Sequence, residues 1–183
     1  DDVQQVLLLT AGVVKITQLG SSGLEAIVRL AVPGDVLGAD GLVSHGKHSA
    51  SAQVFRPSKG QFWDAAVFKS LVNRYPVLHE NMVRILGADL LELEERFHEV
   101  ATERVAARVA RQLVRLQAQI GRRVVGAVEV DLSREELAQM TGTTLFTVSR
   151  LLSAWELRGV VRPRREAVAI TNVEALCEIC EEG

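Results

Sequence analysis

Residues 132–161 read LSREELAQMTGTTLFTVSRLLSAWELRGVV, and this stretch decides the fold of the second half of the chain. Ser133 stands where a helix N-cap belongs, and Glu136 three residues later completes a capping box that satisfies N–H groups of the first turn. Gly142 interrupts the helix, because glycine adopts a left-handed backbone without a Cβ penalty, and Thr144 caps a second helix. The stretch therefore predicts a helix-turn-helix.

The second of these helices has an apolar face and an outward face. The apolar positions at spacings i, i+3, i+4 and i+7 are Val148, Leu151, Leu152 and Trp155. The outward positions are Leu145, Phe146, Ser149, Arg150 and Ser153. Two large apolar side chains in an exposed first turn are unusual, and they are explained if this turn enters a DNA major groove. The alternative is an ordinary helical hairpin in an all-α domain.

A basic β-hairpin is expected directly after the second helix. Residues 160–162 and 167–170 predict two short strands around a Pro-Arg-Arg turn, and residues 128–131 predict a third strand. Three arginines at or beside the tip suit contact with DNA phosphates: Arg162, Arg164 and Arg165. The hairpin is therefore interpreted as the wing of a winged helix.

Residues 132–152 and the wing resemble the winged helix at the C-terminal end of the cyclic-AMP receptor protein and FNR (Crp/Fnr) family of bacterial transcription regulators, and the resemblance extends over nearly the whole chain. It implies an α+β fold: a cyclic-nucleotide-binding-type β-roll (a jelly-roll barrel), a long dimerisation helix and a C-terminal winged helix-turn-helix. It also implies a sequence-specific transcription regulator rather than an enzyme. Such a regulator is a homodimer that reads a palindromic operator in double-stranded DNA, responds to a small-molecule effector and works with RNA polymerase.

The expected domains follow in order along the chain. Residues 1–100 are expected to form a sensor domain, with the barrel at 1–63 and the dimerisation helix at 76–100. This domain is expected to be N-terminally incomplete, since the chain starts at Asp1 without a methionine. Residues 101–183 are expected to form the DNA-binding domain, with the helix-turn-helix at 133–159 and the wing at 160–170.

Charge is divided unevenly between these halves. Residues 1–100 hold 9 Lys and Arg against 12 Asp and Glu, whereas residues 101–172 hold 12 against 7. The basic excess therefore lies in residues 101–172, which contain the expected helix-turn-helix and wing, although the whole chain has a formal net charge of −2.

The cysteine content and the hydropathy pattern indicate the cellular compartment in which the protein is expected. No run is long enough to span a membrane and no secretory signal is visible. Cys177 and Cys180 give no disulfide framework, which suits a cytoplasmic protein. One CxxC supplies only two thiolates, so we expect ordinary surface or core cysteines here rather than a zinc site.

The first 63 residues contain short aliphatic or β-branched runs. Predicted strands cover residues 6–9, 13–17, 26–30 and 52–55, with breaks at Gly12, at Gly20-Ser21-Ser22-Gly23, at Pro33-Gly34 and at Pro57. Regular short strands with glycine turns predict an antiparallel barrel or sandwich.

The resemblance also places an effector pocket. Family members hold a cyclic nucleotide with a Gly-Glu pair and an Arg-Ser or Arg-Thr pair; the matching positions here are Gly38-Ala39 and His48-Ser49, with Leu93 added from the helix. Ala39 has no acceptor for the ribose hydroxyl, and a neutral imidazole does not replace a guanidinium on the phosphate. We therefore expect neither cyclic AMP nor cyclic GMP to bind, and the effector is unidentified.

Two histidines suggest a function of a different class. His45 and His48 in a β-barrel suggest a cupin-like metalloprotein, although cupins use His-x-His on a strand and the spacing here is His-x-x-His in a predicted loop. Exposed loop histidines are ordinarily solvated. Two cofactors stay open, both as in some relatives. One is haem bound to one of these histidines, and the other is an iron–sulfur cluster held by N-terminal cysteines.

The helix predicted from Pro76 onward carries two series of apolar residues seven apart. The first series is Val83, Leu90 and Phe97, and the second is Leu86, Leu93 and Val100. Together they predict the seam of a parallel coiled-coil dimer, because two recognition helices held one DNA turn apart can read a palindrome. The alternative is that the seam packs the helix on its own barrel.

The next helix, residues 103–120, has a basic face and an apolar stripe. The basic face consists of Arg104, Arg108, Arg111 and Arg115 at helical spacing. This face is interpreted either as a surface toward phosphates or the linker, or as an ordinary solvated charged face.

Base contacts follow from the resemblance. Arg150 occupies the position of an arginine that binds guanine, and Ser149 precedes it as in FNR-like members. Phe146 stands where an acidic residue is common in the family, so the carboxylate that would accept from cytosine N4 is missing. The family's TGTGA and TTGAT half-sites are therefore in doubt. Leu145 and Phe146 suit contact with a thymine methyl group instead. The remaining predicted DNA contacts are with phosphates, by Thr143, Thr144 and Thr147 at the helix start and by the three wing arginines.

Overall fold

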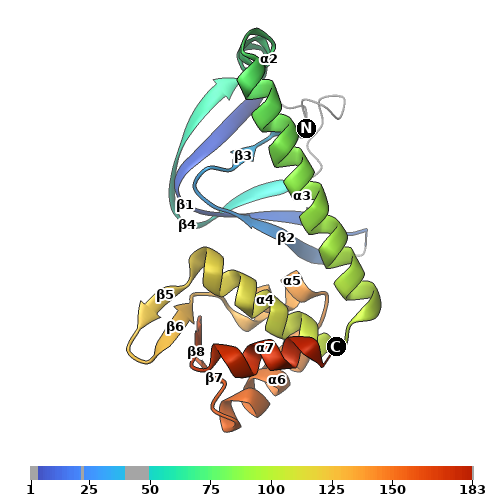
Figure 1. Cartoon of the computed structure of the whole chain (residues 1–183), viewed down its shortest axis with the longest axis vertical. Coiled ribbons are helices and arrows are strands. Elements are labelled where there is room, and N and C mark those ends of the chain that lie inside the picture. The colour runs from blue at the N-terminus through green and yellow to red at the C-terminus, as the bar shows by residue number, and fades with distance from the viewer. Residues whose placement is uncertain (1–3, 22, 40–49, 183) are drawn as a thin grey trace. The chain divides into compact units, whose positions relative to one another are not determined.

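The computed structural model describes residues 4–21, 23–39 and 50–182. The chain divides into two compact units, Asp1–Glu94 and Glu95–Gly183. Each unit has its own four-stranded sheet, whose strands are labelled in Figure 1. Each unit also has its own apolar core. The architecture is the predicted α+β fold, with a roll of antiparallel strands in the first unit and a winged helix-turn-helix in the second. No helix among the described residues is long and apolar enough to cross a membrane.

The sheet of the first unit is built around one long strand. Its strands are β1 (Gln5–Leu19), β2 (Glu25–Ala31), β3 (Val36–Leu37) and β4 (Ser51–Asp64). β1 pairs antiparallel with each of the other three. The buried side chains of Leu9, Val14, Ala31 and Leu37 form a cluster. Leu9 and Val14 both come from β1, which therefore supplies half of the cluster.

The predicted strand breaks at Gly12 and Pro57 are wrong. β1 continues through Gly12, and β4 continues through Pro57. The pairing of β1 with β4 shifts register on both sides of Ala11, so these positions are β-bulges. Gly12 has φ 86° there, and a Cβ on it would lie 2.3 Å from the Pro57 carbonyl oxygen. The two residues thus permit a close approach of the two strands inside the sheet.

Two helices follow the sheet. α2 (Ala65–Arg74) begins after Asp64, which stands at the N-cap position, although its side chain makes no capping hydrogen bond. α3 (Pro76–Thr102) runs without interruption through residue 100, where a domain boundary was expected. The division into compact units falls earlier, between Glu94 and Glu95, and the backbone leaves the helix only after Thr102.

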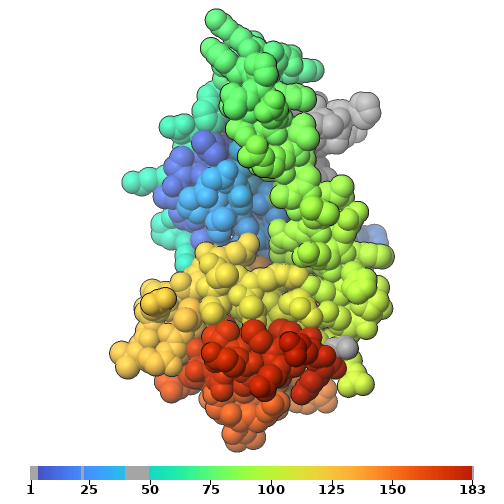
Figure 2. Space-filling view, viewed as in Figure 1, coloured from blue at the N-terminus to red at the C-terminus, as the bar shows by residue number. Residues whose placement is uncertain are grey.

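The second unit contains the elements of a winged helix. Its helices are α4 (Val105–Ile120), α5 (Arg134–Thr141), α6 (Leu145–Leu157) and α7 (Val173–Glu181). Its strands are β5 (Arg122–Val124), β6 (Ala127–Val130), β7 (Val161–Pro163) and β8 (Val168–Ile170), in the sheet order β5-β6-β8-β7. α4 packs against α5, α7 and β6, and α7 covers one side of the unit in the space-filling view (Figure 2).

Candidate nucleic-acid interface

The helix-turn-helix has the local geometry that its sequence predicts. The Ser133 hydroxyl accepts a hydrogen bond from the Glu136 N–H at 3.1 Å, and Glu136 Oε2 accepts one from the Ser133 N–H at 3.0 Å. Gly142 ends α5 in the left-handed region at φ 60°. The Thr144 hydroxyl then caps α6 by accepting from the Thr147 N–H at 3.2 Å. These side-chain bonds fix the turn that aims α6.

α6 buries one face and exposes the other. Val148, Leu152 and Trp155 are buried, as predicted for the apolar stripe. On the opposite face Phe146 is 77% exposed and Leu145 is 50% exposed. Burying a large apolar side chain is worth about 1.5 to 3 kcal/mol, and this unit gains only a small part of that from Phe146. The first turn of α6 is therefore an apolar surface without a partner inside the described part of its own unit.

The wing lies where it was predicted. β7 and β8 pair with Arg162 opposite Ala169, and the Arg164 N–H donates to the Ala167 carbonyl at 2.7 Å to close the turn. Arg162 and Arg165 are exposed and make no ion pair with any residue that the structure describes. Arg164 differs, since its Nη1 lies 2.8 Å from Glu129 Oε2.

Five side chains of α6 and the wing are exposed, and the arginines among them form no ion pair with any residue that the structure describes. We name these five residues the recognition surface: Leu145, Phe146, Arg150, Arg162 and Arg165. Ser149 is half-buried next to Arg150, and Thr143, Thr144 and Thr147 lie at the N-terminus of α6. The predicted DNA-contacting residues are thus brought together at two neighbouring elements, with Arg164 turned toward Glu129.

Three of the four arginines on the basic face predicted for α4 are engaged within the unit, Arg111 and Arg115 by carboxylates and Arg108 by backbone carbonyl oxygens. Arg115 Nη1 donates to Glu99 Oε2 at 2.9 Å, and Arg115 Nη2 also meets Glu99 Oε1. Arg111 Nη2 lies 2.9 Å from Glu103 Oε1, and Arg108 Nη1 donates to the Glu103 carbonyl at 2.9 Å. These five residues, Glu99, Glu103, Arg108, Arg111 and Arg115, are the junction cluster. They join the end of α3 to α4, so the linker-facing interpretation of these three arginines is the one that the geometry supports.

The junction cluster extends to the end of α7. Arg111 Nη2 donates to the Cys180 carbonyl at 3.0 Å. Burial disfavours the charge of Arg111, but the hydrogen bond and charge of Glu103, with the more distant Cys180 and Glu99, raise the pKa of Arg111 overall. Burial raises the pKa of the Cys180 thiol, and the Arg111 charge offsets part of this effect.

The two cysteines occupy different environments. Cys177 is exposed, whereas Cys180 is buried with its Sγ 3.3 Å from the Leu176 carbonyl oxygen. No group of three or more His, Cys, Asp or Glu side chains in the described ranges could hold a metal ion. His45 and His48, on which the cupin-like and haem alternatives depend, lie outside the described residues.

The first unit contains a cavity of about 700 Å³. Gly38 and Ala39 line it as predicted for the effector pocket, whereas Leu93 is exposed on α3 and does not line it. His48 and Ser49 lie outside the described residues. Arg29 is the one arginine among the described lining residues, and its guanidinium already meets Asp35 at 3.1 Å and Asp89 at 3.7 Å.

The heptad seam of α3 is largely open. Five of its six residues, Val83, Leu90, Leu93, Phe97 and Val100, are between 54% and 74% exposed. Leu86 is half-buried and lines the cavity of the first unit. Packing of the helix on its own barrel therefore accounts for Leu86 and leaves the other five uncovered.

Two functional candidates were missed from the sequence, and both are buried carboxylates. Glu99 is 9% exposed and Glu129 is 4% exposed. A signal existed for Glu99, because Glu95, Glu99 and Glu103 follow at spacings of four and precede arginines at helical spacing. Glu129 stands between valines in a short strand, where nothing local distinguishes it from a solvated residue.

Both halves of the chain match known domain families. Residues 107–179 match the Crp-like helix-turn-helix domain, and residues 1–75 match the cyclic nucleotide-binding domain.

Relatives of known name align over most of the chain. The CRP-like cAMP-activated global transcriptional regulator of Mycobacterium tuberculosis is 27% identical over 174 residues, which cover 94% of this chain and 78% of the relative. The cyclic AMP receptor protein of Thermus thermophilus is 28% identical over 176 residues, covering 96% and 79%. The fumarate and nitrate reduction regulatory protein of Shigella dysenteriae is 22% identical over 181 residues, covering 98% and 72%.

Solved structures share the fold. A CRP-family transcriptional regulator from Thermus thermophilus superposes with a TM-score of 0.86 at 21% identity, covering 99% of this chain and 90% of that one. FixK2 from Bradyrhizobium japonicum superposes with a TM-score of 0.84 at 21% identity, covering 98% and 88%.

Proposed function

The chain belongs to the Crp/Fnr family of bacterial transcription regulators, and from this premise we propose that it is a homodimer that binds a palindromic operator and acts on RNA polymerase. It carries a helix-turn-helix DNA-binding domain, and the relatives that it resembles are regulators rather than enzymes. We therefore propose a binding function without catalysis.

The observation that carries this proposal is the recognition surface. Phe146 is 77% exposed beside the exposed Arg150 at the start of a well-capped helix. An exposed apolar ring is unfavourable in water, and together with the neighbouring guanidinium it is complementary to a major groove, which offers thymine methyl groups and guanine acceptors. We propose that Arg150 binds guanine O6 and N7, and that Leu145 and Phe146 contact thymine methyl groups.

Phosphates are the proposed partners of the surrounding groups. Thr143, Thr144 and Thr147 lie at the α6 N-terminus, where unpaired N–H groups and the helix dipole favour an anion. Arg162 and Arg165 lie on an adjoining hairpin, where their charges can release counterions from the DNA backbone. These contacts would position the protein on any duplex and leave sequence choice to α6.

A second copy of the chain is the proposed cover for the α3 seam. Val83, Leu90, Leu93, Phe97 and Val100 are exposed along one helix at heptad spacing. A parallel pairing of two such helices would bury them and give the assembly the two-fold symmetry of a palindrome.

The effector is proposed to be a small molecule other than cyclic AMP or cyclic GMP. Ala39 lines the cavity without an acceptor for a ribose hydroxyl, and Arg29 is already compensated by two carboxylates. A cyclic phosphate would thus meet no uncompensated cation among the described lining residues. Isothermal titration is expected to show no binding of either nucleotide at micromolar concentrations, and micromolar binding would refute this part of the proposal.

Selection of bound duplexes from random DNA is the direct test of the function. The full chain is expected to enrich a palindrome whose half-sites are one helical turn apart, with guanine and thymine at the positions read by α6. Enrichment of a half-site without symmetry would contradict the dimer, and no enrichment at low salt would contradict the regulator.

Sedimentation tests the seam separately. Leu90→Glu with Leu93→Glu is expected to give monomers, because charged side chains cannot be buried in a coiled-coil seam. Leu91→Glu with Glu94→Lys is a matched control on the same helix, since neither residue belongs to the seam, and it should leave the dimer intact. Dimers of the seam variant would show that another surface joins the subunits.

A further inference from the structure

Glu129 on β6 has the most buried carboxylate among the described residues of the second unit, with a side chain only 5% exposed. Each of its oxygens meets a different arginine. Oε1 accepts from Arg122 Nη2 on β5, and Oε2 lies 2.8 Å from Arg164 Nη1 in the wing turn. The Arg164 contact lacks the alignment of a hydrogen bond, so charge attraction is its main component. One buried carboxylate therefore holds two cations from separate segments.

The register of the sheet explains how the wing reaches Glu129. Arg122 lies opposite Glu129, Glu129 opposite Ala169, and Ala169 opposite Arg162. Directly opposed residues of antiparallel strands point to the same face, so these four form one row across the sheet. Ala169, with its single methyl group, is the only residue of this row between Glu129 and the wing strand β7. Glu129 is thus only one strand away from the wing strand β7, and Arg164 in the wing turn reaches its carboxylate.

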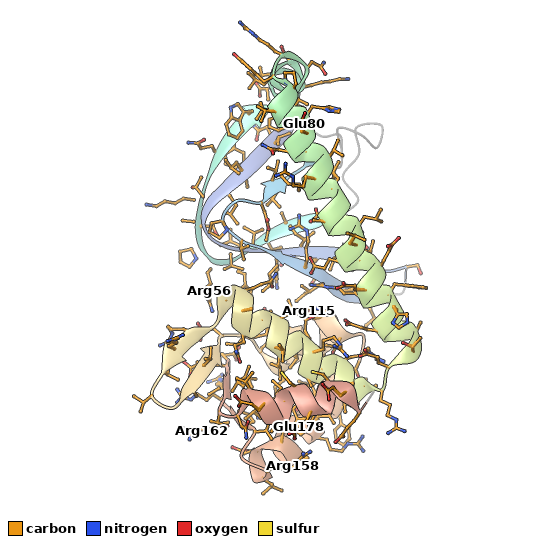
Figure 3. All side chains as sticks on the ribbon, in the orientation of Figure 1. Arg56, Glu80, Arg115, Arg158, Arg162 and Glu178 are labelled. Atoms are coloured by element: carbon orange, nitrogen blue, oxygen red, sulfur yellow. The ribbon has the colours of Figure 1, made fainter. Side chains whose placement is uncertain are left out.

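The wing arginines consequently differ in charge environment. Arg165 is the immediate neighbour of Arg164 and is exposed, with no ion pair among the described residues. Arg162, labelled in Figure 3 at β7, is exposed in the same way. The charge of Arg164 is compensated by Glu129. A guanidinium that is already compensated neutralises a phosphate less well and so releases fewer counterions from the DNA. Removing it also leaves a buried carboxylate with one partner fewer.

We propose that Glu129 is a positioning residue of the DNA interface: through Arg164 it holds the wing so that Arg162 and Arg165 meet the DNA backbone. Arg164 is then part of the wing's support and does not itself neutralise a phosphate. This inference rests on the proposed function in one respect, namely that the wing contacts DNA; the attachment of the wing to β6 does not depend on it.

The salt dependence of binding to a duplex of random sequence tests the DNA part. Arg165→Ala is expected to lower the slope of log affinity against log salt by about 0.9 for each lost phosphate contact. Arg164→Ala should weaken binding but change the slope by much less, because its charge is already compensated. Glu129→Gln removes the same support but leaves Arg164 uncompensated, so its slope should be steeper than that of Arg164→Ala. The double variant should bind no more weakly than Arg164→Ala alone, because Arg164→Ala has already released the wing. Equal slopes for Arg164→Ala and Arg165→Ala would overturn the assignment of Arg164.

Hydrogen exchange tests the attachment without DNA. The amide of residue 164 donates to the Ala167 carbonyl at 2.7 Å and reports on the wing turn. Glu129→Gln and Arg164→Ala are each expected to accelerate its exchange several-fold, whereas Arg165→Ala should not. Arg164 has a half-exposed side chain, at 54%, so its truncation leaves the core of the unit intact. Unchanged exchange in both variants would overturn the positioning role, even if the wild-type protein bound no DNA and the proposed function itself failed.

Discussion

Two arginine-rich surfaces of the second unit can be compared directly. In the junction cluster, Arg115 and Arg111 face the carboxylates of Glu99 and Glu103 at hydrogen-bonding distance. On the recognition surface, Arg150, Arg162 and Arg165 are exposed and form no ion pair with any residue that the structure describes. Figure 3 labels Arg115 on α4 and Arg162 at β7, one from each surface.

The difference teaches that arginine content alone does not mark a DNA-binding face. Arginine is the preferred residue for buried ion pairs and for phosphate or guanine recognition alike. What separates the two uses is compensation: a paired guanidinium stabilises the fold, and an unpaired one is left for a ligand. Substitutions at the two surfaces should therefore affect different quantities.

The largest expected effect is on stability, from Arg115→Ala. The side chain of Glu99 is 11% exposed and that of Arg115 is 23% exposed, so the carboxylate would lose a largely buried partner. Breaking a buried pair costs about 3 to 5 kcal/mol. Arg111 Nε remains 3.6 Å from Glu99 Oε1, and we therefore expect a decrease of about 2 to 3 kcal/mol in the free energy of unfolding. Urea denaturation of the full chain at fixed protein concentration measures it.

Arg150→Ala is the matched control for stability. An exposed residue without a partner contributes within about 0.5 kcal/mol, so its unfolding curve should overlay that of the wild type. Equal destabilisation by both substitutions would remove the distinction between the two surfaces.

The second expected effect is on DNA recognition, from the same Arg150→Ala variant. Loss of a bidentate contact with guanine should reduce the affinity for the selected operator by about 1 to 3 kcal/mol and relax the preference at that base pair. Binding to random duplexes should fall much less. Fluorescence anisotropy on both duplexes measures the two affinities, and an equal loss on each would place Arg150 on a phosphate rather than a base.

Local sequence rules predicted most of the recognition surface. The capping box of Ser133 and Glu136, the left-handed Gly142 and the cap at Thr144 each depend on residues at most a few positions apart. Because these interactions are contained in short segments, their geometry follows from residue type and spacing. The face that α6 exposes then follows from helical periodicity.

The junction cluster could not be predicted in the same way. Periodicity places Arg108, Arg111 and Arg115 on one side of α4, but it does not say what lies opposite them. Their partner Glu99 is 16 residues from Arg115 and belongs to the preceding helix, so the pairing depends on how the chain turns between α3 and α4. The sequence therefore left two alternatives open, a basic surface toward phosphates or the linker and an ordinary solvated charged face.

A related limit explains the wrong strand breaks in the first unit. Gly12 and Pro57 each interrupt a strand by local rules. In the sheet they lie close together as neighbouring irregularities of two paired strands, and the Ser58 hydroxyl, beside Pro57, donates to the Val13 carbonyl, beside Gly12, at 3.2 Å. Compensation between segments this far apart in sequence is invisible until the strands are paired.

The third expected effect is smaller and concerns the apolar part of the recognition surface. Phe146→Ala removes a side chain that is 77% exposed, so the free energy of unfolding should change little. Loss of contact with a thymine methyl should weaken operator binding by about 1 kcal/mol, the low end for a base contact. Replacing that thymine with uracil removes the methyl from the DNA instead, and the two changes together should cost no more than one alone. Additive losses would show that Phe146 contacts another group.

The smallest expected effect is a dependence of stability on pH at the edge of the junction cluster. Burial raises the pKa of the Cys180 thiol in the folded chain, so the neutral thiol is favoured by folding. This contribution is fully present below the thiol pKa of the unfolded chain, about 8.5, and is lost as the pH rises through the higher folded value. The free energy of unfolding of the wild type should thus decline more steeply above that pH than that of Cys180→Ala. Cys177→Ala, at the exposed cysteine of the same helix, should keep the wild-type slope. The cavity that Cys180→Ala creates lowers the free energy of unfolding at every pH, so the comparison uses the slopes against pH and not the absolute values. Identical slopes in all three proteins would show that the Cys180 thiol has the same pKa in the folded and unfolded chain.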